Sequence, residues 1–297
     1  MYARVGREGA RSMGSSAKLD HLLEDVVTLP SLPSTVAHIT QLLNDPDTTV
    51  QEVGKAIAAD TALALKTLRL VNSAYYGVRE KISTVEHAAV LLGMKVIKNL
   101  VFTAAVFDSL QFGEEDLLRH NVSCGIAMKH LLASGLVQAE GIENADEGFV
   151  FGLLHDVGKI IMQHYMEEDA RAVKEACVGR DLTAVEAELE VTGVDHAEIG
   201  ARLAQQWKLQ SQLVDAIAGH HDLSRCADPA NRKIAAILAV ADYVAYQAGM
   251  PAHEYMRVKI SEEMWQETGL TPETSAPIVE KMIESIAEVD ELVHLAD

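Results

Sequence analysis

From Leu22 onward, apolar residues recur at intervals of three and four positions, and few stretches alternate between apolar and polar as a strand would. This spacing places apolar side chains on one face of a helix and polar side chains on the other. The segment TALALKTLRLV at 61–71 shows it over several turns. The pattern therefore predicts an all-α fold.

Several helix starts are marked by residues that can cap a first turn. Thr49 with Glu52, and Thr183 with Glu186, match the capping box, in which a hydroxyl and a carboxylate three positions apart bond to backbone amides. Further starts are predicted at Ser34, at Asp60, at Ser83 with Glu86, and after Gly193. Loops are predicted at 44–48 and 75–81, and at least one amphipathic helix is predicted in the segment 271–295.

The chain contains no internal repeat and no long low-complexity linker, so we expect two packed helical halves that meet near residues 108–116. The predicted parts are a disordered tail at 1–18, an N-terminal helical half at 19–110, a second helical half at 111–250 and a helical extension at 251–297. The tail is rich in Gly, Ser and Arg, and either Met1 or Met13 could be the biological start.

Composition narrows the function classes. Hydrophobic residues make up 48% of the 297 positions, which is enough for a sizeable core. The formal net charge of −19 disfavours nucleic acids and anionic membrane surfaces as partners. No window approaches 18 consecutive apolar residues, so no membrane-spanning segment is expected. The three cysteines are far apart and form no CxxC, which argues against a thiolate metal site or a disulfide framework and favours the cytoplasm.

The most apolar stretch of the chain contains an anomaly. Residues 152–162 read GLLHDVGKIIM, so His155, Asp156 and Lys159 interrupt a run of Leu, Val, Ile and Met. Burying such groups without partners costs several kcal/mol each. Adjacent residues on a helix point about 100° apart, so His155 and Asp156 cannot satisfy each other fully. Partners are therefore expected on other helices.

Candidate partners occur in four other apparently helical segments. They are His120, His196, the pair His220 and His221, and Asp242, which again is a carboxylate within an apolar helix. Imidazoles and carboxylates together suit a divalent ion, with iron, manganese or zinc favoured over magnesium. Because the set exceeds the ligand positions of one ion, two ions bridged by a carboxylate could hold an activated water for attack on phosphorus. Lys159 could stabilise a phosphate oxygen or brace a ligand, and Asp116 could be a further ligand or accept a hydrogen bond from His120.

A simpler interpretation stays open for each residue taken singly, because a lone histidine on an apolar helix usually bonds to a backbone carbonyl in the core. The seven remaining histidines have no comparable context and are predicted to be surface or capping residues: His21, His38, His87, His130, His164, His253 and His294. Tyr75 and Tyr76 are expected to pack at their loop, and the acidic run 167–169 is expected to be a solvated helix end.

At these residues the sequence resembles the HD superfamily of metal-dependent phosphohydrolases. The superfamily pattern of H, HD, further H and a distal D is carried by His120, His155, Asp156, His196, His220, His221 and Asp242. The first half resembles one branch, the HDOD (HD-related output domain) family, through LPSLPSTVAHITQLLNDPD, IAADTALALKTLRLVNSAYYG and ISTVEHAAVLLGMKVIKNLV. With the HD half, this resemblance covers about residues 22–245.

The resemblance implies an all-helical bacterial signalling module whose second half is an HD-like bundle. Many members of the branch have lost metal ligands, whereas every ligand type aligns here. After His220 and His221 the sequence DLSRCADP lacks the GYP triplet of the branch that hydrolyses cyclic di-GMP, which makes that substrate doubtful.

Two functions follow as hypotheses. The first is a metal-binding signalling protein with phosphohydrolase or phosphodiesterase chemistry on a nucleotide or related phosphoester, using Asp156 and Lys159 as catalytic residues. The second is a catalytically silent scaffold that acts through protein partners. No receiver or sensor domain is recognised in the chain, so the input is expected in trans.

Overall fold

The computed structural model describes residues 38–39, 41–42, 45, 47–73, 76–78, 81–94, 96–97, 100–101, 104, 115–142, 145–253 and 257–296. Within these ranges the named elements are all helices, and the only β-type pairing is an isolated bridge between Thr183 and Arg257. The predicted all-α fold is confirmed.

Three helices of the N-terminal half are described: α3 (Val50–Ala58), α4 (Thr61–Val71) and α5 (Val85–Leu92). The capping box of Thr49 and Glu52 starts α3, and the Asp60 carboxylate caps α4 by accepting from the Leu63 amide. The cap of α5 is Thr84, whose hydroxyl accepts from the amide three positions on, so the prediction of Ser83 was wrong by one residue. The predicted cap at Ser34 lies outside the described residues.

The larger group of helices follows. Its members are α7 (Glu115–Ala133), α8 (Ala145–Leu154), α9 (Val157–Tyr165), α10 (Glu167–Cys177), α11 (Ala184–Val191), α12 (His196–Gln206), α13 (Ser211–Gly219), η3 (Leu223–Arg225), η4 (Pro229–Asn231), α14 (Arg232–Gln247), α15 (Glu262–Thr268), α16 (Pro272–Glu284) and α17 (Ile286–Ala296). The capping box of Thr183 and Glu186 starts α11, as predicted. Asp195 caps α12 by accepting from the Glu198 amide.

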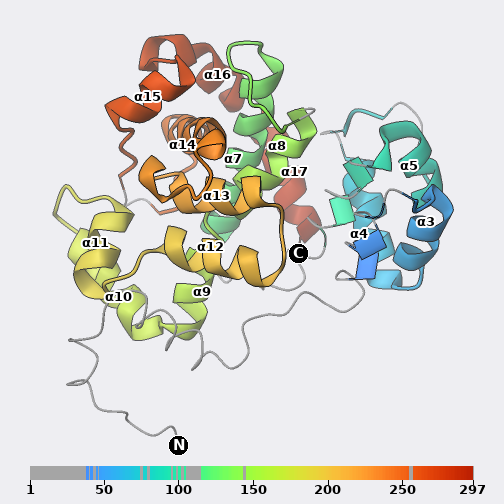
Figure 1. The fold of residues 1–297 in the computed structure, drawn as a ribbon, viewed down its shortest axis with the longest axis horizontal. Helices are drawn as coiled ribbons and strands as arrows, with labels where there is room; N and C mark the ends of the chain where they lie inside the picture. The colour runs from blue at the N-terminus through green and yellow to red at the C-terminus, as the bar shows by residue number, and fades with distance from the viewer. Residues whose placement is uncertain are drawn as a thin grey trace, which may run out of the picture.

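Helices α7 and α14 form the centre of this bundle. Helix α7 packs on α8, α14, α16 and α17, and α14 packs also on α13 and α15 (Figure 1). The contact between α7 and α8 is very close, because a Cβ on Gly152 would lie 2.3 Å from the backbone carbon of Cys124. Glycine at this position therefore lets the two helix backbones meet.

Helices α3, α4 and α5 form a group to one side of the bundle, and α17 lies between the two groups (Figure 1). Helix α17 contacts both α4 and α7. It thus packs an apolar face on the body of the molecule, one of the two places predicted for the tail helix. The domain boundaries stay predictions, since residues 1–37 and 105–114 are not described. No helix in the described part of the chain is long and apolar enough to cross a membrane.

The structure corrects the expected setting of the HD pair. Helix α8 ends at Leu154 and α9 begins at Val157, so His155 and Asp156 lie at a break between two helices rather than within one. Asp156 is the N-cap residue of α9, with φ −98° and ψ 16°. At this break the two side chains lie together, with Nε2 of His155 3.4 Å from Oδ2 of Asp156.

Candidate metal centre

All seven predicted ligands are brought together in the interior of the larger bundle. They come from α7 (His120), the break between α8 and α9 (His155 and Asp156), the start of α12 (His196), the end of α13 (His220 and His221) and α14 (Asp242). Six of them are buried, and His221 is partly exposed. Lys159, on the first turn of α9, joins the cluster through its ammonium group.

One oxygen of Asp156 faces the first group of ligands. Its Oδ2 atom lies 3.6 Å from Nε2 of His120 and 3.4 Å from Nε2 of His155. Oδ1 of Asp242 lies 3.2 Å from the same His120 nitrogen. The Lys159 ammonium donates to Asp156 Oδ2 over 2.6 Å. His120, His155, Asp156 and Asp242 could together hold one ion.

The other oxygen of Asp156 faces a second group. Its Oδ1 atom lies 3.1 Å from Nε2 of His196 and 3.9 Å from Nε2 of His220. The Nε2 atoms of His196 and His221 are 3.0 Å apart. A single carboxylate thus lies between two sets of nitrogen ligands, as a bridging ligand would.

Hydrogen bonds to Nδ1 fix the tautomers of the ligand histidines. The Nδ1 acceptors are the carbonyls of Met250 for His120, Gly152 for His155 and Ile217 for His220, at 2.7–2.8 Å. Because a carbonyl only accepts, each of these Nδ1 atoms carries a proton, and Nε2 is the ring nitrogen that faces the cluster. Nδ1 of His196 lies 2.7 Å from the Glu188 carboxylate, which also accepts from the His196 amide. This arrangement is typical of histidines that bind metal through Nε2.

The pKa values of the cluster residues depend on two opposing effects, burial and the charges of neighbouring side chains. Burial raises the pKa of Asp156, but His155, the Lys159 ammonium and His196, which also donates a hydrogen bond to the carboxylate, hold that pKa well below its usual range. Burial and the neighbouring imidazoles lower the pKa of His220 to about 3. Burial lowers the pKa of His196, but the Glu188 carboxylate reverses the shift and raises it to about 9.

The donor set fits divalent metal ions. Oδ1 of Asp156 is fully buried, and its near neighbours are Nε2 of His196 at 3.1 Å and Nε2 of His220 at 3.9 Å, so an ion at this position could be held by all three side chains. Imidazole nitrogens and carboxylate oxygens suit iron, manganese or zinc. The described residues therefore contain a buried cluster that could hold one or two such ions.

Asp116 does not join the cluster. It lies one turn before His120 on α7, and its side chain is exposed. Nδ1 of His120 donates to the Met250 carbonyl instead of to Asp116. The prediction of Asp116 as a ligand or acceptor was therefore wrong.

Three residues at the site were missed by the sequence analysis. Cys124 is fully buried beside His120 and His155, and burial, then the carboxylates of Asp242 and Asp156, raise the pKa of its thiol well above the usual value. Its signal was the four-residue spacing from His120. Glu188 and His253 are the other two, and neither has a local motif.

A cavity of about 240 Å³ opens onto the cluster. His120, His221 and Asp242 line it together with Lys159 and two further cations, Arg257 and Lys259. The two surface cations come from the segment that pairs with the start of α11. Glu186 also lines the cavity and lies 3.9 Å from the Lys259 ammonium, so the lining carries three Lys and Arg side chains and two carboxylates, Asp242 and Glu186.

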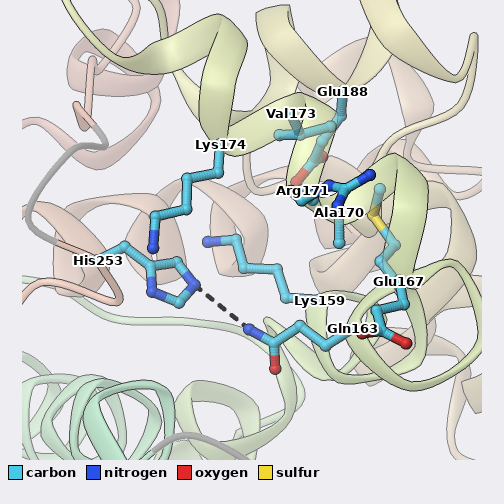
Figure 2. A pocket seen from close by; sticks show the side chains of 10 residues that line it. Lys159, Gln163, Glu167, Ala170, Arg171, Val173, Lys174, Glu188 and His253 are labelled. Atoms are coloured by element: carbon cyan, nitrogen blue, oxygen red, sulfur yellow. Dashed lines mark hydrogen bonds between the residues drawn. The ribbon is translucent and has the colours of Figure 1, made fainter.

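A neighbouring cavity of similar size lies on the α10 side of Lys159. Figure 2 shows the side chains of Lys159, Lys174 and His253 converging there, with Gln163 at one side. Nε2 of His253 lies 3.4 Å from Nε2 of Gln163. His253 and Lys159 line both cavities, so they form the wall between them.

The remaining histidines differ in their settings. His38, His87, His164 and His294 are exposed, as predicted, and His21 lies outside the described residues. His253 is buried, with 7% of its surface exposed, so its assignment to the surface was wrong. The physical reason is that the chain after α14 turns back over the cluster. His130 is half-buried against Ser285.

Two minor predictions can also be compared. The acidic run 167–169 forms the first turn of α10, where Glu167 and Glu168 are exposed, in agreement with a solvated helix end. Tyr76 is half-buried against the core, as expected, whereas Tyr75 lies outside the described residues.

Comparison with known proteins gives a consistent result. The sequence-family model of the HDOD domain matches residues 29–223 of this chain. An uncharacterised protein of Treponema pallidum (strain Nichols) is 28% identical over 196 residues, which are 66% of this chain and 38% of that protein. The chain thus spans well under half the length of this relative.

Several solved structures have a similar fold. An HDOD domain protein of unknown function from Geobacter sulfurreducens is 25% identical with a TM-score of 0.72, covering 95% of this chain and 99% of its own. A protein from Shewanella amazonensis SB2B with a provisional phosphohydrolase name has the same identity and TM-score, with coverages of 93% and 98%. A protein from Marinobacter aquaeolei VT8 that is provisionally named a signal transduction protein is 17% identical, with a TM-score of 0.74, and the match covers 95% of this chain and 65% of that chain. At this identity the similarity demonstrates a common fold and no common function. Since the family model matches well over half of the chain, the protein belongs to the HDOD domain family.

Proposed function

We propose that this HDOD protein is a metal-dependent phosphohydrolase that acts on a phosphoester of a nucleotide or related compound. The observation that carries the proposal is the position of the Asp156 carboxylate between two sets of inward-facing nitrogens, next to a cavity lined by cations. The provisional phosphohydrolase name of the Shewanella structure agrees with the proposal.

The ions would be held by His120, His155 and Asp242 on one side and by His196, His220 and His221 on the other, with Asp156 shared. When bound, such ions activate water for attack on phosphorus and neutralise charge on phosphate oxygens. The protein itself orients the ligands, because every Nδ1 described above is fixed by a hydrogen bond before a ligand arrives.

Lys159 is the residue placed to act on substrate. Its ammonium is held at the cluster by Asp156, and its side chain lines the cavity with only 11% of its surface exposed. Burial lowers the pKa of this group, but Asp156 and Asp242 raise it above the usual value, so it stays charged. A charged group at this position can bind a phosphate oxygen and hold it against the ligands. Arg257 and Lys259, at the wider part of the cavity, would attract the anion.

The test begins with the metal content of protein purified without chelator, followed by an assay against an activated phosphodiester and a panel of nucleotides and cyclic dinucleotides. We expect stoichiometric metal and turnover of at least one compound. Asp156→Asn should abolish both, because the amide cannot bridge as an anion. Absence of metal from the wild-type protein would refute the proposal.

Lys159→Met separates substrate binding from metal binding. We expect metal to be retained and kcat/KM to fall by about 100-fold or more, the range typical for removal of a positioned charge from a reacting group. Lys55→Met, which removes an exposed lysine of α3, should leave kcat/KM unchanged. Stoichiometric metal without turnover of any compound would instead favour the scaffold function, in which protein partners act in trans.

A further inference from the structure

Cys124 lies within the first group of ligands. It follows His120 by one turn of α7 and is fully buried. Its Sγ atom is 3.8 Å from Nε2 of His120 and 4.0 Å from Nε2 of His155. The close contact of α7 with Gly152 of α8 brings the sulfur to this position.

These spacings are near those of ligands around one ion. Bonds of about 2.3 Å to sulfur and about 2.0 Å to nitrogen, at a tetrahedral angle, separate the two ligand atoms by about 3.6 Å. One ligand atom each from His120, Cys124, His155 and Asp242 lie within 4.8 Å of one another. Nδ1 of each histidine donates to a carbonyl, so Nε2 is the ring nitrogen of each that faces the cluster and could bind an ion.

Charge balance favours an anionic ligand here. The carboxylates of Asp156, Asp242 and Glu188 carry fewer negative charges than two divalent ions and a lysine ammonium carry positive ones. A buried excess of positive charge is costly. A thiolate at Cys124 would add a further negative charge to the group that contains Asp242.

We propose that Cys124 binds, as a thiolate, the ion held by His120, His155 and Asp242, and that it biases this position toward zinc, iron(II) or cobalt(II) over manganese. The inference rests on the proposed function, since it requires that the cluster binds metal. The thiol loses its proton to solvent as the sulfur–metal bond forms, and no electron is transferred. Sulfur ligands favour the softer ions of the divalent series, whereas manganese favours oxygen.

Titration of metal-free protein with cobalt(II) tests the proposal directly. A cobalt–thiolate bond produces a charge-transfer absorption band in the near ultraviolet, which nitrogen and oxygen ligands do not produce. We expect this band in the wild-type protein and its loss in Cys124→Ser, with visible cobalt absorption retained. Cys177→Ser and Cys226→Ser are the matched controls and should keep the band, because neither residue belongs to the cluster.

A competition experiment tests the effect on selectivity. The ratio of zinc to manganese affinity should fall by at least about tenfold in Cys124→Ser, the lower end of what supporting residues of metal sites contribute. If serine at this position disturbs folding, Cys124→Ala provides a second variant. The presence or absence of the cobalt–thiolate band in the wild-type protein tests the proposal without any variant.

The outcomes separate the two proposals. Cobalt bound at stoichiometric level without the charge-transfer band, or a band that survives in both Cys124 variants, would overturn the role of Cys124 and leave the proposed function standing. Failure of the wild-type protein to bind any metal would overturn both.

Discussion

At the residue scale, Glu188 illustrates what holds a ligand in place. Its carboxylate accepts from both the ring and the backbone amide of His196 and is buried with 2% of its surface exposed. We expect Glu188→Gln to weaken metal binding by about 10–100-fold, because the neutral amide orients the imidazole less strongly and lowers its basicity. Metal titration of the purified variant measures this change.

The matched control for that substitution is Glu190→Gln on the same helix. Glu190 pairs with Arg180 at the surface, so its loss should leave metal affinity unchanged. Equal metal affinities for wild type and Glu188→Gln would show that the carboxylate does not support the ligand.

The residues of the cluster divide according to how much the sequence could reveal. His155, Asp156 and Asp242 were predictable because a charged group in an apolar stretch needs a partner. Glu188 was not, because it lies in AVEAELEV among other glutamates, where only tertiary packing distinguishes the buried carboxylate from the exposed ones. His253 was likewise hidden, since its burial depends on the path of the chain after α14.

At the element scale, the crossing of α9 and α12 determines where His196 lies. A Cβ on Gly158 would be 1.9 Å from the His196 carbonyl oxygen and 2.9 Å from the Gly200 nitrogen. Gly158→Ala should therefore push the two helices apart, displace His196 and destabilise the fold by about 1–3 kcal/mol or more. Denaturant unfolding and metal titration should both detect the change.

A helical glycine without a backbone neighbour provides the comparison for Gly158. A Cβ on Gly54 of α3 would meet only the flexible side chain of Glu86. Because alanine favours helix by about 1 kcal/mol over glycine, Gly54→Ala should be nearly neutral or stabilising. Equal effects of the two substitutions would mean that the close crossing at Gly158 is not rigid.

The junction of α7 with α16 and α17 should be sensitive to acid through His130. Its Nε2 atom lies 3.0 Å from the Ser285 hydroxyl, and burial, followed by Lys281 and Lys129, lowers its pKa to about 4. The unfolded chain binds this proton near pH 6.5, whereas the folded protein does not until about pH 4. Stability should therefore fall as the pH decreases from about 6.5 to about 4.

His130→Gln removes this proton-binding group while keeping a polar side chain. We expect the loss of unfolding free energy between pH 7.5 and pH 5 to be smaller in the variant than in the wild type. His87→Gln, at an exposed position of α5, should not change the pH dependence as much. Identical pH profiles for wild type and His130→Gln would contradict the assignment.

Helix positions were largely predictable, whereas the break at the HD pair was not. Capping residues such as Thr49, Asp60 and Thr183 act within one turn, so local sequence specifies them. The run GLLHDVGKIIM keeps a helical pattern through residues 155 and 156, where the structure has a break between α8 and α9. The spacing of apolar residues does not specify this break.

At the scale of the whole molecule, the charge distribution separates the surface from the site. The chain carries 44 acidic against 25 Lys and Arg residues, yet Lys159, Arg257 and Lys259 gather around one cavity. The composition therefore indicates that distant anionic partners such as nucleic acids are disfavoured, whereas these three cations can attract a small anion at the cavity itself. Net charge alone could not have located the cavity.

Because the proposed ligands come from α7, α12, α13, α14 and the break before α9, a bound ion would link most of the larger bundle into one unit. An ion that binds only the folded state stabilises it by about 2.7 kcal/mol at a free concentration 100-fold above its Kd. Removal of metal by a chelator should thus lower Tm by several degrees, and restoring the ion should recover it. His155→Ala should have a reduced Tm that no longer responds to either treatment, because the site is already impaired. Calorimetry with and without chelator gives the answer: a wild-type Tm that is indifferent to chelator and added ion would mean that metal, even if bound, does not hold these helices together.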